Sequence, residues 1–143
     1  MEKTDIHIIG LGNLGSSFLE GLMSSNSDHS IKVYELSNEV LETYEKLYPE
    51  NDYFNSFDDF NSGVLILCVK PQSINEIFNQ IKGKIHEDVL ICSPIAGLEI
   101  DHIEKSLGNK IIRIMPNLLI RNNNGFIPYA KNYDNDYIDF IKS

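Results

Sequence analysis

Three glycines near the start of the chain, Gly10, Gly12 and Gly15, have the spacing of a phosphate-binding turn. They follow a short apolar run and open a segment with apolar residues at helical spacing, which is the order found in a dinucleotide-binding βαβ unit. Gly10 would make the tight turn, Gly12 would let a pyrophosphate approach the backbone, and Gly15 would let the helix pack on the strand. The free amides of the first helical turn would then hold the phosphate charge. The alternative is an ordinary strand–turn–helix corner, because glycine clusters also occur in plain turns.

Glu35 places an acidic side chain at the end of the second predicted strand, about 20 residues beyond the glycine turn. A carboxylate there can accept hydrogen bonds from the ribose hydroxyls of an adenosine, and it would repel a 2′-phosphate. Leu36 adds no arginine to offset that repulsion, so the sequence favours NAD(H) over NADP(H). Ser37 could add a hydroxyl to the same ribose. The alternative is an exposed glutamate at a strand end.

Lys70 follows the most apolar run of the chain, residues 64–69, which is typical of a central strand buried on both faces. Because parallel sheets bind ligands beyond the carboxyl ends of their strands, Lys70 is a candidate ligand contact, although a solvated surface lysine fits equally well. Segments 92–93 and 115–117 stand at equivalent strand ends. No pairing of nucleophile and base is evident, so no catalytic residue is assigned. Nicotinamide chemistry needs no protein nucleophile, since the cofactor carries the hydride, but it often needs a proton donor, and no residue is a convincing one.

Short apolar runs alternate with segments of helical period over most of the chain. This pattern predicts an α/β fold of the Rossmann-like, doubly wound type, with a mainly parallel sheet and helices on both faces. Asn38 is expected to cap a helix, Pro71 to stand in the first turn of another, and residues 55–62 to form a loop with one helical turn. The predicted strands cover residues 5–9, 31–35, 53–54, 64–69, 89–92, 110–115 and, as an edge strand, 126–130.

The amino-acid composition excludes some classes of binding partner. The 143 residues carry a net charge of −9, from 12 basic and 21 acidic residues, which argues against nucleic acid and anionic membranes as partners. No apolar run approaches about 18 residues and no secretory leader is seen. Cys68 and Cys92 lie in apolar runs, so we expect buried free thiols and a cytoplasmic protein. The spacing of Cys and His residues fits no metal site.

The chain resembles the N-terminal domain of pyrroline-5-carboxylate reductase, within the wider 6-phosphogluconate-dehydrogenase-like group. Four ordered segments carry the resemblance: I-I-G-L-G-N-L-G-S-S at 8–17, C-V-K-P-Q at 68–72, S-P-I-A-G at 93–97 and R-I-M-P-N at 113–117. The family transfers a hydride from NAD(P)H to the C=N bond of a cyclic imine, pyrroline-5-carboxylate, and so forms proline. The resemblance therefore implies an NAD(P)H-dependent oxidoreductase.

The resemblance also implies which residues contact the cofactor. Residues 10–15 would hold the pyrophosphate, Asn55 would join Glu35 and Ser37 near the adenosine ribose, and segments 96–97 and 115–117 would approach the nicotinamide. The complete set is Gly10, Leu11, Gly12, Asn13, Leu14, Gly15, Glu35, Ser37, Asn55, Val69, Lys70, Pro71, Ala96, Gly97 and Asn117.

Two features differ from the family. Leu118 and Leu119 replace its Thr-Pro pair, and the chain stops at Ser143, before the helical domain that completes the family's substrate site. We therefore expect a nucleotide-binding domain over residues 1–130 and the start of a truncated helix over 131–143. The chain would bind NAD(P)H, and it would form a homo-oligomer or associate with a partner chain that supplies the missing helical domain. The alternative function is a stand-alone dinucleotide-binding or regulatory module without turnover.

Overall fold

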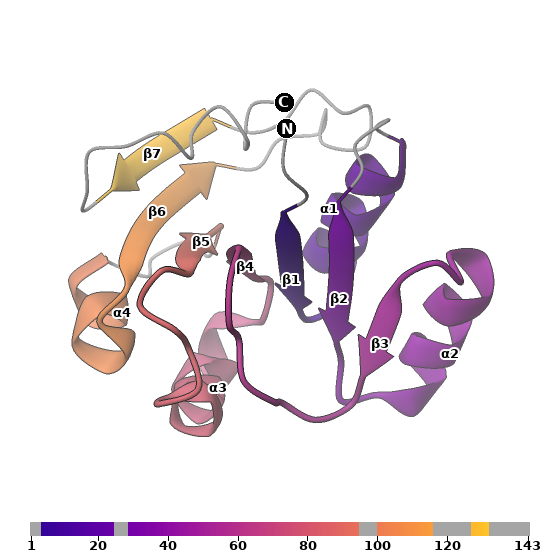
Figure 1. Cartoon of the computed structure of the whole chain (residues 1–143), viewed down its shortest axis with the longest axis horizontal. Helices are drawn as coiled ribbons and strands as arrows, with labels where there is room; N and C mark the ends of the chain where they lie inside the picture. Colours follow the sequence, from indigo (N-terminus) through magenta and orange to yellow (C-terminus); the bar gives the residue numbers. More distant parts are fainter. Residues whose placement is uncertain (1–3, 25–28, 95–99, 116–126, 132–143) are drawn as a thin grey trace.

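The structure is a computed structural model that describes residues 4–24, 29–94, 100–115 and 127–131 (Figure 1). The strands are β1 (Asp5–Ile9), β2 (Ser30–Tyr34), β3 (Asp52–Phe54), β4 (Val64–Leu67), β5 (Leu90–Ser93), β6 (Lys110–Met115) and β7 (Ile127–Lys131). The helices are α1 (Asn13–Ser24), α2 (Asn38–Leu47), α3 (Ile74–Ile81) and α4 (Ile100–Leu107), with a short 3₁₀ turn, η1 (Pro71–Ser73), before α3.

The described strands form one seven-stranded sheet in the order β3-β2-β1-β4-β5-β6-β7. Strands β1 to β6 run parallel, and β7 pairs antiparallel with β6 at the edge. The strand order reverses between β1 and β4, which lie side by side at the centre. In open α/β sheets a ligand crevice forms at this reversal, beyond the carboxyl ends of the strands.

Both faces of the sheet are buried. Successive residues of a strand point to opposite faces, and in β4 each set belongs to a different core cluster. Val64 and Ile66 belong to a cluster that includes residues of α1 and α2. Leu65 and Leu67 belong to a second cluster that includes residues of α3 and α4. Helices therefore lie on both faces of a mainly parallel sheet, and the predicted Rossmann-like fold is confirmed (Figure 1).

Most element boundaries fall within one or two residues of the prediction. One cap differs: the residue that caps α2 is Ser37 rather than Asn38, because its extended backbone lets the Ser37 hydroxyl accept a hydrogen bond from the Val40 amide at 3.4 Å. Pro71 opens η1, which leads into α3 as expected. The helix predicted near residues 137–142 lies outside the described residues, and the proposed boundary at residue 130 stays a prediction.

The helical turn predicted within residues 55–62 is wrong, since this fully described stretch contains none. The Phe60 amide donates to the Lys84 carbonyl at 2.8 Å, and the Phe60 carbonyl accepts from the His86 amide at 2.9 Å. These bonds commit the backbone of Phe60 to another segment, so it cannot join a helical turn. The fully buried Phe60 ring instead packs against the Tyr34 ring at a centroid distance of 5.1 Å.

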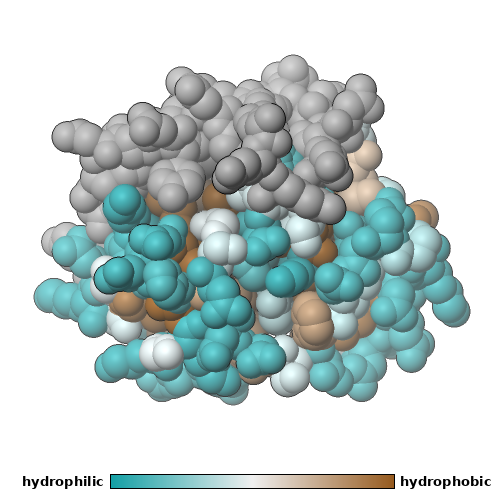
Figure 2. Space-filling view, viewed as in Figure 1, coloured by the Kyte–Doolittle hydropathy of each residue, from teal (hydrophilic) through white to brown (hydrophobic). Residues whose placement is uncertain are grey.

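On the face that Figure 2 shows, the described residues are mostly hydrophilic, and hydrophobic residues are visible in small patches between them. The large hydrophobic side chains that remain exposed are Leu36, Leu47 and Phe54. Among the described helices, none has the length and apolar character that crossing a membrane requires.

Candidate functional site

The three glycines of the turn between β1 and α1 have two different roles. Gly10 has a φ of 98°, and a Cβ at this position would lie 2.6 Å from the carbonyl oxygen of Cys68. A Cβ on Gly15 would collide with the carbonyl oxygen of Gly10. A Cβ on Gly12 would meet no described atom within 4 Å. The fold therefore requires Gly10 and Gly15, whereas Gly12 borders open space, where a ligand would approach the backbone.

The start of α1 presents amides to that open space. The Ser16 hydroxyl donates to the Gly12 carbonyl at 2.7 Å, which turns this carbonyl into the helix. Within the described ranges, the amides of Asn13, Leu14 and Gly15 have no hydrogen-bond acceptor. Unpaired first-turn amides at the positive end of a helix dipole favour an anion. No side chain or carbonyl of the described residues takes that place.

Glu35 lies beside the glycine turn and is fixed at both of its carboxylate oxygens. One oxygen accepts from the Leu11 amide at 3.0 Å, and the other accepts from the Ser37 amide at 2.8 Å. The amide of Glu35 itself donates to the Phe54 carbonyl at 3.0 Å, which ties the end of β2 to β3. Since an ionised carboxylate can accept more than one hydrogen bond per oxygen, capacity remains for ligand hydroxyls.

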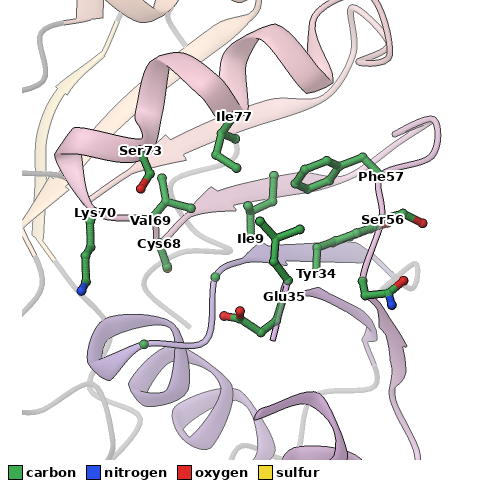
Figure 3. Close-up of a pocket in the computed structure, with 14 residues that line it drawn as sticks. Ile9, Tyr34, Glu35, Ser56, Phe57, Cys68, Val69, Lys70, Ser73 and Ile77 are labelled. Atoms are coloured by element: carbon green, nitrogen blue, oxygen red, sulfur yellow. The ribbon is translucent and has the colours of Figure 1, made fainter. Parts of the chain in front are cut away.

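A cavity of about 280 Å³ opens at the carboxyl ends of β1, β2 and β4. Figure 3 shows Lys70 and Ser73 at one end, near the start of α3, and Ser56 and Phe57 at the other. Glu35 projects from the end of β2 on the side of the glycine turn. The lining residues are Ile9, Gly10, Gly12, Tyr34, Glu35, Leu36, Asn55, Ser56, Phe57, Cys68, Val69, Lys70, Ser73 and Ile77.

The cavity brings together a large part of the predicted cofactor set. Six predicted residues line it directly, namely Gly10, Gly12, Glu35, Asn55, Val69 and Lys70. Leu11, Asn13, Leu14 and Gly15 belong to the same turn and helix start, and Ser37 contacts Glu35 through its amide. Pro71 opens η1 but does not line the cavity. Ala96, Gly97 and Asn117 lie outside the described residues.

Asn55 is held at the rim of the cavity. Its side-chain nitrogen donates to Asn38 Oδ1 at 2.9 Å, and none of the residues that the structure describes hydrogen-bonds its side-chain oxygen, which can therefore accept from a ligand.

The sequence did not reveal the apolar wall of the cavity. Tyr34 and Phe57 form part of this wall, and their rings stack at a centroid distance of 5.8 Å. Burial raises the pKa of Tyr34 to about 12, helped by nearby acidic groups, so its phenol stays neutral. Tyr34 is the last residue of β2 and stands next to Glu35 in the predicted strand 31–35, at the ligand-binding edge, and that position was a usable signal. Phe57, in an irregular loop, gave none.

Cys68 lines the wall behind the glycine turn. Burial raises the pKa of both Cys68 and Cys92 well above the usual range of a thiol, so neither is a thiolate nucleophile at neutral pH. Both thiols are free, as predicted. In the part of the chain that the structure describes, no three His, Cys, Asp or Glu residues are grouped to hold a metal ion.

Comparison with known proteins also indicates a dinucleotide-binding domain. The family model described as "NADP oxidoreductase coenzyme F420-dependent" matches residues 5–97. A pyrroline-5-carboxylate reductase of Methanosarcina acetivorans is 29% identical over 125 residues, which cover 82% of this chain and 46% of that protein. One of Staphylococcus epidermidis is 30% identical over 150 residues, which cover 94% of this chain and 55% of that protein. The chain thus spans about half the length of the curated relatives it matches.

Solved structures agree on the fold. A pyrroline-5-carboxylate reductase of Coxiella burnetii superposes with a TM-score of 0.81 at 25% identity, covering 97% of this chain and 54% of that one. The Plasmodium falciparum pyrroline carboxylate reductase, solved with NADP bound, gives 0.74 at 24% identity, covering 96% of this chain and 51% of that one. At this lower identity the likeness concerns the fold alone.

Proposed function

This chain belongs to the family described as NADP oxidoreductase, coenzyme F420-dependent, as an NAD(P)-binding domain related to pyrroline-5-carboxylate reductases, and on that premise we propose that it positions NAD(P)H for hydride transfer to a cyclic imine. The nicotinamide would carry the hydride, and the protein would bind and orient the cofactor. Because the chain spans about half the length of its curated relatives, we propose further that a helical domain outside these 143 residues completes the imine site.

One observation carries the cofactor proposal. The position that a Cβ of Gly12 would occupy is empty, and it lies beside first-turn amides that have no acceptor among the described residues. A diphosphate supplies the charge and the oxygens that such a corner accommodates. The cavity continues from this corner past Glu35 to Phe57, a path that suits the adenosine half of the cofactor.

The geometry of Glu35 supports a preference for NADH. Two backbone amides hold its carboxylate, so it cannot turn away from a 2′-phosphate without giving up both bonds. Ribose hydroxyls can donate to this carboxylate, whereas a phosphate would repel it. The NADP in the Plasmodium enzyme is a property of that protein.

Isothermal titration with NADH and NADPH tests both proposals. We expect NADH to bind about tenfold more tightly than NADPH, a difference of about 1.4 kcal/mol. Glu35→Gln should reduce that ratio, because it removes the charge that repels the phosphate. Glu39→Gln, on the exposed first turn of α2, is the matched control and should leave the ratio unchanged. Absence of binding by either nucleotide at millimolar concentration rejects the cofactor proposal, and tighter NADPH rejects the preference.

Turnover is tested separately, by pyrroline-5-carboxylate-dependent oxidation of NADH. We expect little activity from this chain alone, because the described cavity offers the cofactor a cradle but no assigned group for the substrate carboxylate. Adding the helical half of a related reductase as a separate chain should raise the rate. Full activity of the 143-residue chain by itself would contradict the requirement for a helical domain.

A binding module without turnover is the second candidate. The observation that favours it is that the described cavity offers a cradle for a dinucleotide but no assigned group for a substrate carboxylate. Nucleotide binding without imine-dependent oxidation, even in the presence of the helical half, would support this alternative.

A further inference from the structure

One wall of the cavity comes from a loop rather than from a strand or a helix. Residues 55–62 lead from the carboxyl end of β3 toward β4, and Phe57 of this loop lines the cavity at the end away from Lys70 (Figure 3). The Phe57 ring stacks on the Tyr34 ring at a centroid distance of 5.8 Å. In a loop, no ladder of backbone hydrogen bonds holds the chain, so single contacts decide where a side chain lies.

The backbone of this loop has few bonds to the rest of the protein. At its start the Phe54 carbonyl accepts from the Glu35 amide at 3.0 Å, and at its far end both backbone groups of Phe60 bond to segment 84–86. Between these two anchors, and within the described ranges, the one backbone group that bonds to another segment is the carbonyl of Phe57. The position of Phe57 in the wall therefore depends on the donor of that bond.

The donor is the ammonium group of Lys84, which lies 3.3 Å from the Phe57 carbonyl oxygen. The backbone of Lys84 is itself fixed on both sides. Its amide donates to the Ile81 carbonyl at 2.9 Å, across a turn in which Gly83 has a φ of 82°, and its carbonyl accepts from the Phe60 amide at 2.8 Å. A charged donor also makes a stronger hydrogen bond than a neutral one. Lys84 thus ties the middle of the loop to a rigid point.

We propose that Lys84 is a positioning residue of the cavity, which holds Phe57 in the wall through the Phe57 carbonyl. The inference rests on the proposed function, since Phe57 borders the part of the cavity proposed for the adenosine half of the cofactor. Lys84 does not line the cavity, so it acts on a ligand through Phe57. Without the bond, the loop between its two anchors gains freedom, and a ligand must restore its order at a cost in affinity.

A lysine can also raise the affinity for an anionic ligand by long-range attraction. That effect needs no bond to Phe57, and Lys82, two residues before Lys84, would share it. The Lys82 side chain is exposed and bonds to none of the residues that the structure describes. It is therefore the matched control for Lys84.

The test compares the affinities for NADH and ADP, measured by isothermal titration. Lys84→Met keeps the apolar stem of the lysine but removes its charge and its donors, and we expect it to weaken both ligands about three- to tenfold. ADP lacks the nicotinamide half, so equal losses assign the effect to the adenosine end. Lys84→Arg keeps a charged donor and should stay within about twofold of the wild type. Lys82→Met should also stay within about twofold.

A double-mutant cycle separates positioning of the ring from a general effect on the fold. Phe57→Ala removes the ring that Lys84 would position, so adding Lys84→Met to this variant should weaken NADH binding by less than about a further twofold. Circular dichroism checks that each variant is folded. Lys84→Leu, which also lacks a donor, replaces Lys84→Met if that variant is not folded.

Wild-type affinity in Lys84→Met, or equal losses in Lys84→Met and Lys82→Met, overturns the inference. A loss that Lys84→Arg shares, or that is as large in the Phe57→Ala background, overturns it as well. So does an effect on NADH that ADP does not show. In all these cases the proposed function stands, because the wild type still binds NADH. Failure of the wild type to bind NADH rejects the proposed function, and the inference with it.

Discussion

At the scale of single residues, the three glycines of the first turn are not equivalent. Gly10 and Gly15 are required by the chain itself, because a side chain at either would meet backbone atoms. Gly12 is not, since the space beside it is open. Spacing alone suggested a separate role for each glycine, and the contacts of the hypothetical Cβ atoms now separate a folding requirement from a binding requirement.

Gly12→Ala and Gly15→Ala should therefore have different effects. Gly12→Ala should change the free energy of unfolding by less than about 0.5 kcal/mol, yet weaken NADH binding at least about tenfold, because the methyl group occupies the approach of the diphosphate. Gly15→Ala should cost about 1–3 kcal/mol of stability, because the backbone must move to admit the methyl group. Urea unfolding and calorimetric titration measure the two quantities. Equal losses of stability in the two variants would contradict this distinction.

Glu35 shows how far residue-level prediction reached. Its place at the end of the second strand was predictable from the interval after the glycine turn. Its bonds to the amides of Leu11 and Ser37 were not, because they depend on the relative position of two loops. These bonds make the carboxylate part of the turn's own structure.

At the scale of elements, the end of α2 is fixed by the strand that follows it. The Tyr53 hydroxyl, from β3, lies 2.8 Å from the Tyr48 carbonyl and 3.0 Å from the Tyr44 carbonyl. Each carbonyl also accepts from a backbone amide, that of Tyr44 from Tyr48 at 2.8 Å and that of Tyr48 from Asn51 at 3.4 Å, so the Tyr53 hydroxyl adds a side-chain donor at the helix end. Burial raises the pKa of Tyr53, which keeps this donor protonated.

Removal of that hydroxyl, in Tyr53→Phe, should lower the free energy of unfolding by about 1 kcal/mol, the typical net value of one hydrogen bond. NADH affinity should stay within about twofold of the wild type, because Tyr53 does not line the cavity at the carboxyl ends of β1, β2 and β4. Tyr48→Phe is the control, since no described residue hydrogen-bonds its hydroxyl, and its stability should change by less than about 0.5 kcal/mol. Urea unfolding measures the stability of both variants. A similar loss of stability in Tyr53→Phe and Tyr48→Phe would show that the Tyr53 hydroxyl is not what stabilises the end of α2.

Element prediction failed where tertiary contacts decide the local backbone. The short apolar runs located the strands, since parallel strands that are buried on both faces are nearly continuous runs of hydrophobic residues. Residues 55–62 carry polar residues and aromatics at spacings that also suit a helical turn. The backbone bonds of Phe60 to the segment after α3 decide the matter, and no local pattern contains them.

At the scale of the whole molecule, acid should weaken the fold through His7. Burial lowers the pKa of His7 in the folded protein, while the unfolded chain titrates near 6.5. The unfolded state therefore binds more protons as the pH falls below about 6.5, and stability is lost until the lowered folded pKa is reached. Each unit of that lowering is worth about 1.4 kcal/mol.

We expect the urea midpoint of the wild type to fall between pH 7.5 and pH 5.5, and that of His7→Gln to fall less. His86→Gln should follow the wild type, since His86 is half exposed. The measurement needs no nucleotide, so it examines the burial of His7 independently of ligand binding. Parallel decreases in wild type and His7→Gln would show that other groups dominate.

The order of strands and the position of the cavity were predictable because chain alternation and right-handed crossovers leave few arrangements. The shape of the cavity was not predictable, since aromatic residues such as Tyr34 and Phe57 are equally common in an ordinary hydrophobic core. Their role depends on which side of the sheet the loop after β3 crosses.

That loop, residues 55–63, has a consequence for how this fold diversifies. Two phenylalanines of this irregular loop, Phe57 and Phe60, pack against the Tyr34 ring at centroid distances of 5.8 and 5.1 Å, and Phe57 also lines the cavity. Lengthening or exchanging the loop would alter the shape and polarity of the cavity while the strands beneath keep their order. Ligand choice in such a domain is therefore separable from its architecture.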